Sequence, residues 1–302
     1  MGTRLRYLYR AYRYRFRVDP AEVRFVRESL RAGDVAVDVG CHKGAYTYWM
    51  RRQVGPSGAV YAFEPQPTQV AYLRQAFSAM AYSNVVLVPE ALSDRDGRRP
   101  LIVPSAKGFT HAATLESRPR EPSQNAAYVG AVSDADASSV GGVSDADDAT
   151  QAEPLSASES PPTIEVDVTT LDAFFADNPR GPTFLKIDVE GHESAVLSGG
   201  YETLARHRPT ILIECEVRHR PDGDVRPVFD FLHSLGYTGS FFRAGRWRPL
   251  AEFDATEHQR LGPDSIELPN GYVNNFAFQA RGLSRRALPA AHHNCHCPRV
   301  TT

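Results

Sequence analysis

The sequence predicts an α/β fold with a doubly wound, mostly parallel β-sheet and an antiparallel closing strand. From Val35 onward, short β-branched runs alternate with helical stretches, as in a chain of β-α-β units. The first run leads into a helix through a turn with two glycines, a feature of strand-to-helix turns in such sheets. The last run follows a Pro-Asn-Gly turn at 269–271, which indicates a hairpin and therefore an antiparallel strand.

Each predicted strand is a short apolar run bounded by turn residues. The runs are VAVDVG at 35–40, AVYAFEP at 59–65, NVVLVPEAL at 84–92, TFLKIDVEG at 183–191, TILIECEV at 210–217 and YVNNFAFQA at 272–280. After the second run, Pro67 suits the first turn of a helix that buries Val70, Leu73 and Phe77 on one side. Right-handed crossovers are expected to place helices on both faces of the sheet.

Residues 1–32 are expected to form a basic, aromatic helical segment ahead of a single main domain at 33–281. Arginine alternates there with tyrosine, leucine and phenylalanine. The side chains that would share one side of this helix are Leu5, Leu8, Tyr12 and Phe16. We interpret this side as packing against the domain. Peripheral contact with an anionic membrane surface is the alternative, because both arrangements produce the same pattern.

Two segments break the rhythm of strands and helices. Residues 116–162 are rich in Ser, Ala, Asp and Pro and contain the near-duplicates VSDADAS and VSDADDA, which predicts a disordered acidic insertion. The spaced aspartates also suit calcium, but the central Gly and terminal Glu of a helix-loop-helix calcium site are missing. Residues 282–302 are predicted to be a flexible tail. Its HHNCHC cluster at 292–297 lacks a second paired cluster, so we expect no metal site.

Bulk composition excludes some function classes. The net charge of the 302 residues is -2, without the basic excess of a nucleic-acid binder, so no nucleic-acid partner is expected. No stretch has the length and apolar purity of a membrane span, and the Arg-rich start lacks the apolar core of a secretory signal. The four cysteines do not have the spacing of a disulfide framework. We therefore expect reduced thiols and a cytoplasmic location.

The strongest local signal is DVGCHKG at 38–44, between a strand and a helix. Gly40 would let the backbone approach a ligand, and Gly44 would let the helix start close to the strand. Glu64 ends the next strand, where such sheets place an acid that accepts hydrogen bonds from ribose hydroxyls. Alternatively, the glycines serve a structural turn and Glu64 interacts with the dipole of the following helix. Because the third glycine of a pyrophosphate site is missing, S-adenosylmethionine fits better than NAD.

A third signal is FLKIDVEGHE at 184–193. In an extended strand, Lys186, Asp188 and Glu190 would point to one side. Charged side chains are costly in a central parallel strand unless they are paired or functional. The carboxyl end of this strand is therefore a candidate site, and a structural ion pair from Lys186 to Asp188 or Glu190 is the alternative.

Taken in order, these segments resemble the FkbM-type S-adenosylmethionine-dependent methyltransferases. The resemblance covers most of residues 34–216. The motifs that carry it are DVGCHKG, YAFEPQP, NVVLVPEALSD, VDVTTLDAF, LKIDVEGHESAVLSGG and RPTILIE. The resemblance implies a seven-stranded, Rossmann-like class I methyltransferase fold. It also implies O-methylation of a hydroxyl on a sugar, glycolipid or secondary metabolite, with a small-molecule, glycan or glycolipid acceptor as the partner.

The resemblance further implies a cofactor site for S-adenosylmethionine. Asp38, Gly40 and Gly44 would surround the methionine part, and Glu64 would hold the ribose. The residues that would border the adenine are Ala91, Leu92 and Ser93. This chain has Cys41-His42 where the family usually has Ala-Asn, so His42 is counted among the cofactor-binding candidates. It also has His192 where the family often has a small residue, which affects the acceptor side.

The predicted chemistry needs a proton acceptor beside the acceptor hydroxyl. A sulfonium methyl is already electrophilic, so the enzyme mainly holds the oxygen in line and removes its proton. Asp188 or His192 is predicted to accept this proton, and Glu190 to orient the acceptor or its base. The next candidates are His42, His111 and Glu214. Transfer to nitrogen or carbon and an NAD-dependent oxidoreductase are the alternative functions, because cofactor motifs do not specify the acceptor atom.

Overall fold

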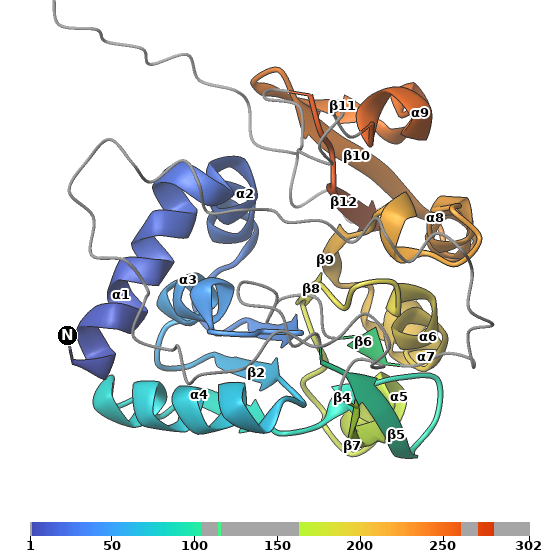
Figure 1. Ribbon diagram of the computed structural model, residues 1–302. Helices are drawn as coiled ribbons and strands as arrows, with labels where there is room; N and C mark the ends of the chain where they lie inside the picture. Colours follow the sequence, from blue (N-terminus) through green and yellow to red (C-terminus); the bar gives the residue numbers. More distant parts are fainter. Residues whose placement is uncertain (1, 104–113, 116–162, 261–270, 281–302) are drawn as a thin grey trace, which may run out of the picture.

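A twisted eight-stranded sheet runs through the centre of the protein (Figure 1). The computed structural model describes residues 2–103, 114–115, 163–260 and 271–280. The strand order is β11-β10-β12-β9-β8-β1-β2-β3. The strands are β1 (Val35–Val39), β2 (Ala59–Phe63), β3 (Val85–Val88), β8 (Phe184–Ile187), β9 (Thr210–Glu214), β10 (Tyr237–Arg243), β11 (Arg246–Pro249) and β12 (Asn275–Ala280).

The sheet is parallel at its centre and antiparallel at one end. β3, β2, β1, β8 and β9 pair in parallel, and β12 enters antiparallel between β9 and β10. All five residues of β1 and all four of β8 are buried, as expected for central strands covered on both faces. The predicted α/β class and the antiparallel closing strand are confirmed. β10 and β11 form a hairpin that was not among the predicted runs, and the sheet has eight strands where seven were expected.

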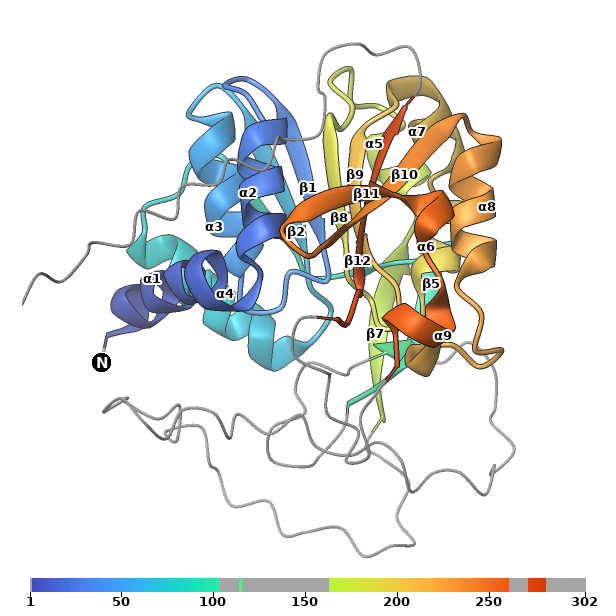
Figure 2. The same cartoon turned by 90° about the horizontal axis from the view of Figure 1, so that it is seen from above.

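Helices cover both faces of the sheet (Figure 2). One face carries α1 (Thr3–Arg13), α2 (Pro20–Ser29), α3 (Ala45–Val54) and α4 (Pro67–Ala79). The other face carries α5 (Leu171–Phe175), α6 (Glu193–Ser198), α7 (Tyr201–His207) and α8 (Arg226–Ser234). The predicted helix after Pro67 is confirmed, with Val70, Leu73 and Phe77 buried. The remaining short helices are η1 (Tyr14–Val18), η4 (Val217–His219), η5 (Leu250–Glu252) and α9 (Ala255–His258).

The N-terminal helix packs on the domain with a different face from the one predicted. Tyr7 and Ala11 are completely buried, and the indole nitrogen of Trp49 donates a hydrogen bond to the Ala11 carbonyl at 2.8 Å. Leu5 and Phe16, expected to be buried, are exposed. The prediction was wrong because this helix has apolar side chains on two opposite faces, and only one of the two faces packs against the domain.

A second, smaller sheet was not predicted from the sequence. It contains β4 (Ala91–Leu92), β5 (Gly97–Ile102), β6 (Thr114–Leu115) and β7 (Thr163–Thr169) in the order β4-β7-β5-β6. The expected single strand over 84–92 is split, because β3 ends at Val88 and Pro89 has no N–H to continue a ladder. The chain therefore changes from one sheet to the other beside the end of β2.

Some predicted features lie outside the described residues. These are the acidic insertion at 116–162, His111 and the tail at 282–302. Within the described ranges, none of the helices has the length and apolar character to cross a membrane. Cys41 and Cys215 are buried free thiols, in agreement with the expected reduced state of these two.

Candidate active site

The loop after β1 is pressed against the end of β8. The Gly40 and Cys41 amides both donate to the Phe63 carbonyl at 3.0 Å, which ties the loop to β2. Gly40 has a φ of +73°, and a Cβ added there would lie 1.9 Å from the Asp188 carbonyl oxygen. Only glycine fits at this position. The sheet therefore brings the predicted cofactor loop and Asp188 into direct contact.

Glu64 lies beneath this loop, and its carboxylate can accept more hydrogen bonds than the loop supplies. Its side chain is buried and accepts hydrogen bonds from the His42 amide at 2.8 Å and the Gln66 amide at 2.9 Å. Burial raises the pKa of Glu64 to about 7, although these two amides lower it. A carboxylate has about four lone-pair positions, so the bonds from these two amides leave room for two hydroxyl donors. Glu64 could therefore hold a ribose through its two hydroxyls.

Asp38 and Gly44 fix the two ends of the loop between β1 and α3. The Thr47 hydroxyl donates to Asp38 Oδ2 at 2.6 Å, and Asp38 is buried, so this carboxylate joins β1 to α3. Gly44 has a φ of +75°, and a Cβ there would lie 3.0 Å from both Leu73 and Tyr7. We infer that Asp38 acts on the cofactor site by fixing the loop, since its side chain is directed into the protein.

His192 is held away from the predicted acceptor side. Its Nε2 lies 3.0 Å from the Ser93 hydroxyl, which itself donates to Asp94 at 3.1 Å. Because Ser93 has one hydroxyl proton, it accepts the hydrogen bond from His192. Burial, followed by the charge of Arg99, lowers the pKa of His192 to about 4, so the ring is neutral at pH 7. This contact fixes Ser93, at the end of the buried pair Ala91–Leu92, to the loop after β8.

Lys186 and Asp188 form an ion pair at the end of β8. Their Nζ and Oδ2 atoms are 2.7 Å apart, and the Lys186 side chain is 2% exposed against 31% for Asp188. Burial opposes the charge on Lys186, but the charges of Asp188, Asp38 and Glu214 outweigh it and raise the Lys186 pKa. Lys186 also lies 4.5 Å from the centre of the Tyr46 ring. The lysine thus compensates several carboxylates beneath the site.

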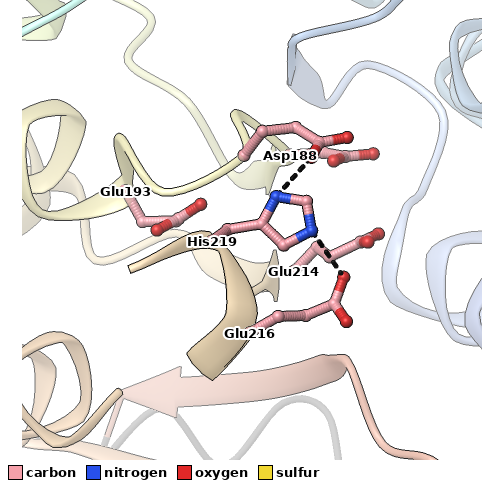
Figure 3. Close-up of a pocket in the computed structure, with 6 residues that line it drawn as sticks. Asp188, Glu193, Glu214, Glu216 and His219 are labelled. Carbon is pink, nitrogen blue, oxygen red and sulfur yellow. Dashed lines mark ion pairs between the residues drawn. The ribbon is translucent and has the colours of Figure 1, made fainter. Parts of the chain in front are cut away.

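An acidic pocket opens between the carboxyl ends of β8 and β9 (Figure 3). Its volume of about 10 Å³ is room for about one water molecule. It is lined by Asp188, Glu190, Glu193, Glu214, Glu216 and His219. In Figure 3 the His219 ring stands at the centre of this group, with Glu193 on one side and Glu216 below. We call this set of six residues the acidic pocket.

His219 and Glu190 form an ion pair inside the acidic pocket. His219 Nδ1 lies 2.5 Å from Glu190 Oε2, and His219 Nε2 lies 3.6 Å from Glu216 Oε1. Burial disfavours the charge on His219, but the hydrogen bond and charge of Glu190 outweigh it and raise the His219 pKa. Burial raises the pKa of Glu190 despite this histidine. The pair can therefore hold or release one proton at the pocket wall.

Glu193 and Glu214 of the acidic pocket are also shifted towards their neutral forms. Burial raises the pKa of Glu193 to about 7, although Oε1 accepts a hydrogen bond from the Gly191 amide at 2.7 Å. Burial, with the charges of Asp188 and Glu216, raises the pKa of Glu214 well above its usual value. Within the described ranges, no three His, Cys, Asp or Glu side chains are arranged to hold a metal ion.

Comparison with known proteins identifies the family. The family model of the methyltransferase FkbM domain matches residues 38–238, which include the cofactor loop and the acidic pocket. The chain belongs to the FkbM methyltransferase family. This membership confirms the family and the methyltransferase class predicted from the sequence, and it agrees with S-adenosylmethionine as the cofactor.

Solved structures with a similar fold are distant from this FkbM methyltransferase in sequence. The FkbM methyltransferase of Methylobacillus flagellatus KT is 13% identical, with a TM-score of 0.46 over 92% of this chain and 55% of its own. An S-adenosylmethionine-dependent O-methyltransferase of Thermotoga maritima is 12% identical, with a TM-score of 0.39 over 86% of this chain and 65% of its own. Aeropyrum pernix fibrillarin with bound S-adenosylmethionine is 10% identical, with a TM-score of 0.39 over 90% and 74%. No curated protein matches the chain.

The chain spans about half the length of the Methylobacillus protein. The family match itself covers the two glycines of the loop, Glu64 and the end of β8 in one continuous range.

The FkbM site contains residues that the sequence did not point to. Asp188 and Glu190 were predicted and line the acidic pocket, whereas His192 points to Ser93 instead. The expected extended run through Glu190 is wrong, because β8 ends at Ile187 and Glu190 has a φ of +51°. His219 and Glu216 were missed as site residues. Glu216 was included in the predicted strand at 210–217, although β9 ends at Glu214, and His219 follows in a polar stretch that carries no motif. Only the parallel pairing of β8 with β9 brings them to Glu190.

Proposed function

We propose that the protein transfers a methyl group from S-adenosylmethionine to a hydroxyl oxygen of a sugar, glycolipid or secondary metabolite. The observation that carries this proposal is the acidic pocket beside the cofactor loop, where Gly40 touches the Asp188 backbone. Carboxylates accept hydrogen bonds from hydroxyls. A volume of about 10 Å³ admits one hydroxyl group and leaves the rest of the acceptor outside.

Asp188 is the proposed proton acceptor. Lys186 donates to Asp188 Oδ2 and fixes the carboxylate, which leaves Oδ1 for the hydroxyl proton. S-adenosylmethionine supplies an electrophilic methyl group when bound. As the new carbon–oxygen bond forms and the sulfur–methyl bond breaks, the hydroxyl proton passes to Asp188, so the total charge is unchanged. Glu190, held by His219, orients the hydroxyl that enters the acidic pocket.

His192 is proposed to act as a positioning residue. A neutral ring bonded to Ser93 fixes the segment that borders the cofactor, but it stands outside the set that lines the acidic pocket. We also propose that the enzyme works in the cytoplasm, in keeping with its free buried thiols. Cell fractionation tests that part.

The test is an acceptor screen with labelled methyl donor, followed by single-turnover rates on the acceptor found. Asp188→Asn is expected to slow transfer by about a hundredfold or more while S-adenosylhomocysteine still binds. Asp230→Asn, which changes an exposed acid on α8, is the matched control and keeps the wild-type rate. Wild-type rates in Asp188→Asn with a hundredfold loss in His192→Ala would transfer the base role to His192. Labelled product on nitrogen or carbon would contradict the hydroxyl acceptor.

A further inference from the structure

Exposed apolar side chains gather at one place in the described residues. Of the seven large apolar side chains that are exposed there, five lie between Leu5 and Val18. Phe16 is 65% exposed and Leu5 is 56% exposed. We call the set formed by Leu5, Tyr9, Tyr12 and Phe16 the outward stripe. Isolated exposed apolar residues need no explanation, but a cluster marks a contact surface.

The outward stripe is a continuous band opposite the buried face of α1. Tyr7 and Ala11 are fully buried against the domain. At about 100° per residue, the stripe positions of α1 lie roughly 140–200° around the helix from Tyr7. The Tyr12 and Phe16 rings stack with centres 6.2 Å apart, so the stripe continues into η1. Figures 1 and 2 show α1 on the outside of the helical layer formed with α3 and α4.

Arginines border the outward stripe on both sides. Residues 1–18 contain six arginines and no acidic residue. The helical spacing puts Arg4 on one side of the stripe and Arg6 and Arg13 on the other. Arg15 lies 5.1 Å from the Phe16 ring centre and 4.8 Å from that of Trp49. The guanidinium of Arg15 thus lies over both aromatic rings, which places its positive charge at the edge of the outward stripe.

The positive charge on this side extends beyond α1. Arg27 of α2 and Arg52 of α3 also lie over Trp49, 5.4 Å and 5.9 Å from its ring centre. Burial, and then the charges of Arg15 and Arg52, lower the pKa of Arg27. Trp49 in turn packs edge-on against Tyr12 of the outward stripe, with ring centres 5.3 Å apart. These positive groups therefore lie beside the outward stripe, which makes this side attractive to an anionic surface.

We propose that the outward stripe and its bordering arginines are a docking surface for an anionic lipid bilayer. An interfacial helix of this kind has an apolar band that enters the headgroup region and cationic side chains that meet lipid phosphates. A second copy of the chain is a poor occupant, because two such faces would bring arginines against arginines, and residues 1–18 contain no acid to pair with them. This proposal does not depend on the proposed function.

The docking surface lies directly behind the cofactor loop. Tyr7, on the buried face of the same helix, is 3.0 Å from where a Cβ on Gly44 would be. At the end of η1, Asp19 accepts a hydrogen bond from the Tyr46 hydroxyl at 2.9 Å, and Tyr46 carries Lys186 over its ring. A bilayer on the outward stripe would therefore lie about one helix diameter, roughly 10 Å, from the loop.

The test is co-sedimentation of the full chain with phosphatidylcholine vesicles, with and without phosphatidylserine. Wild-type protein is expected to bind the anionic vesicles only, and to bind them less as salt rises. The triple variant Leu5→Gln, Tyr9→Gln and Phe16→Gln keeps helix-forming residues and is expected to bind at least tenfold more weakly. Its matched control is Val86→Gln with Tyr201→Gln, which removes the other two exposed apolar side chains.

The contribution of charge is tested separately. Arg4 of α1 and Arg17 of η1 are exposed on this segment. Arg4→Gln with Arg17→Gln is expected to weaken vesicle binding about tenfold. Arg95→Gln with Arg246→Gln, which changes two exposed arginines elsewhere, is expected to bind like wild type. Melting curves verify that all variants are folded.

Several results would overturn the docking proposal. The proposal is contradicted if wild-type protein does not bind anionic vesicles, or if it binds neutral vesicles equally well. Equal losses in the variants and in their controls also contradict it. A dimer in light scattering that the stripe variant abolishes, without vesicle binding, would assign the surface to a second copy. Binding to polyglutamate without vesicle binding would assign it to an acidic protein partner.

Discussion

Glu64 is a single buried side chain whose charge is expected to control cofactor binding. Its pKa of about 7 means that it gains or loses its charge within the physiological range. The ionised form accepts stronger hydrogen bonds from hydroxyls than the neutral form. Cofactor affinity in wild-type protein is therefore expected to rise as pH increases from about 6 to 8, by at most tenfold per pH unit for one proton.

Replacing Glu64 separates this titration from other groups. Glu64→Gln is expected to bind S-adenosylhomocysteine at least about tenfold more weakly at pH 8 and to lose the rise with pH, because a charge-assisted acceptor is worth roughly 1.5–3 kcal/mol. Calorimetric titration at several pH values measures both effects. Unchanged affinity in a folded variant would remove the ribose role, and a pH rise that persists would assign the titration to another group.

A second residue-scale prediction concerns stability. Burial, together with Asp19, raises the pKa of Glu22 in the first turn of α2 to about 7. A carboxylic acid with a raised folded pKa stabilises the fold below its unfolded pKa of about 4.5 and loses this contribution as pH rises to 7. Glu22→Gln is therefore expected to be more stable than wild type at pH 8, with a smaller difference at pH 5. Urea unfolding at the two pH values checks this, and a less stable variant at pH 8 contradicts it.

Among the structural elements, the parallel strands were predictable and the small sheet was not. β1, β2, β8 and β9 are mostly apolar runs that are easily recognised in the sequence. β5 reads GRRPLI, with its first two residues exposed, so its sequence does not distinguish it from a loop. The strand has a partner only because β7 returns from far along the chain to pair with it.

The site residues that could be predicted are those that lie within sequence motifs. Gly40, Glu64 and Asp188 follow directly from predicted strand ends, and the structure brings them together. His219 could not be found in this way, because its place in the site comes from the contact with Glu190 across two strand ends. His192 was predicted as a candidate base, but its ring is hydrogen-bonded to Ser93. This contact arises because the chain crosses from the large sheet to the small one just before Ser93, which the sequence does not show.

The loop between β1 and α3 gives an element-scale prediction. Gly40→Ala is expected to destabilise the protein by more than about 3 kcal/mol, because it combines left-handed strain with a backbone clash. Gly245→Ala is the matched control. Its φ is +80°, but no atom lies within 4 Å of the added Cβ, so only the strain of roughly 1 kcal/mol remains. Chemical denaturation compares the two, and equal losses would contradict the tight contact with Asp188.

At the scale of the whole molecule, the chain leaves and re-enters the described fold at neighbouring points. β6 and β7 both pair with β5: Leu115 lies opposite Leu101, and Thr163 lies opposite Ile102. Neighbouring strands are about 4.8 Å apart, so these two points are separated by about two strand spacings, or roughly 10 Å. A link of a few residues can span that distance.

Deleting residues 119–160 and joining the ends with a short Gly-Ser link is therefore expected to leave the melting temperature within a few degrees of the wild-type value. The deleted stretch nearly lacks large apolar side chains, and loop length changes stability only logarithmically. Affinity for S-adenosylhomocysteine is also expected to persist, because Glu64 and the loop after β1 are held by β1, β2 and β8. A control with a Gly-Ser segment of the original length separates loop length from sequence. A large fall in melting temperature in both proteins would show that the natural segment packs against the domain, and a fall in the short version alone would show that the link is strained.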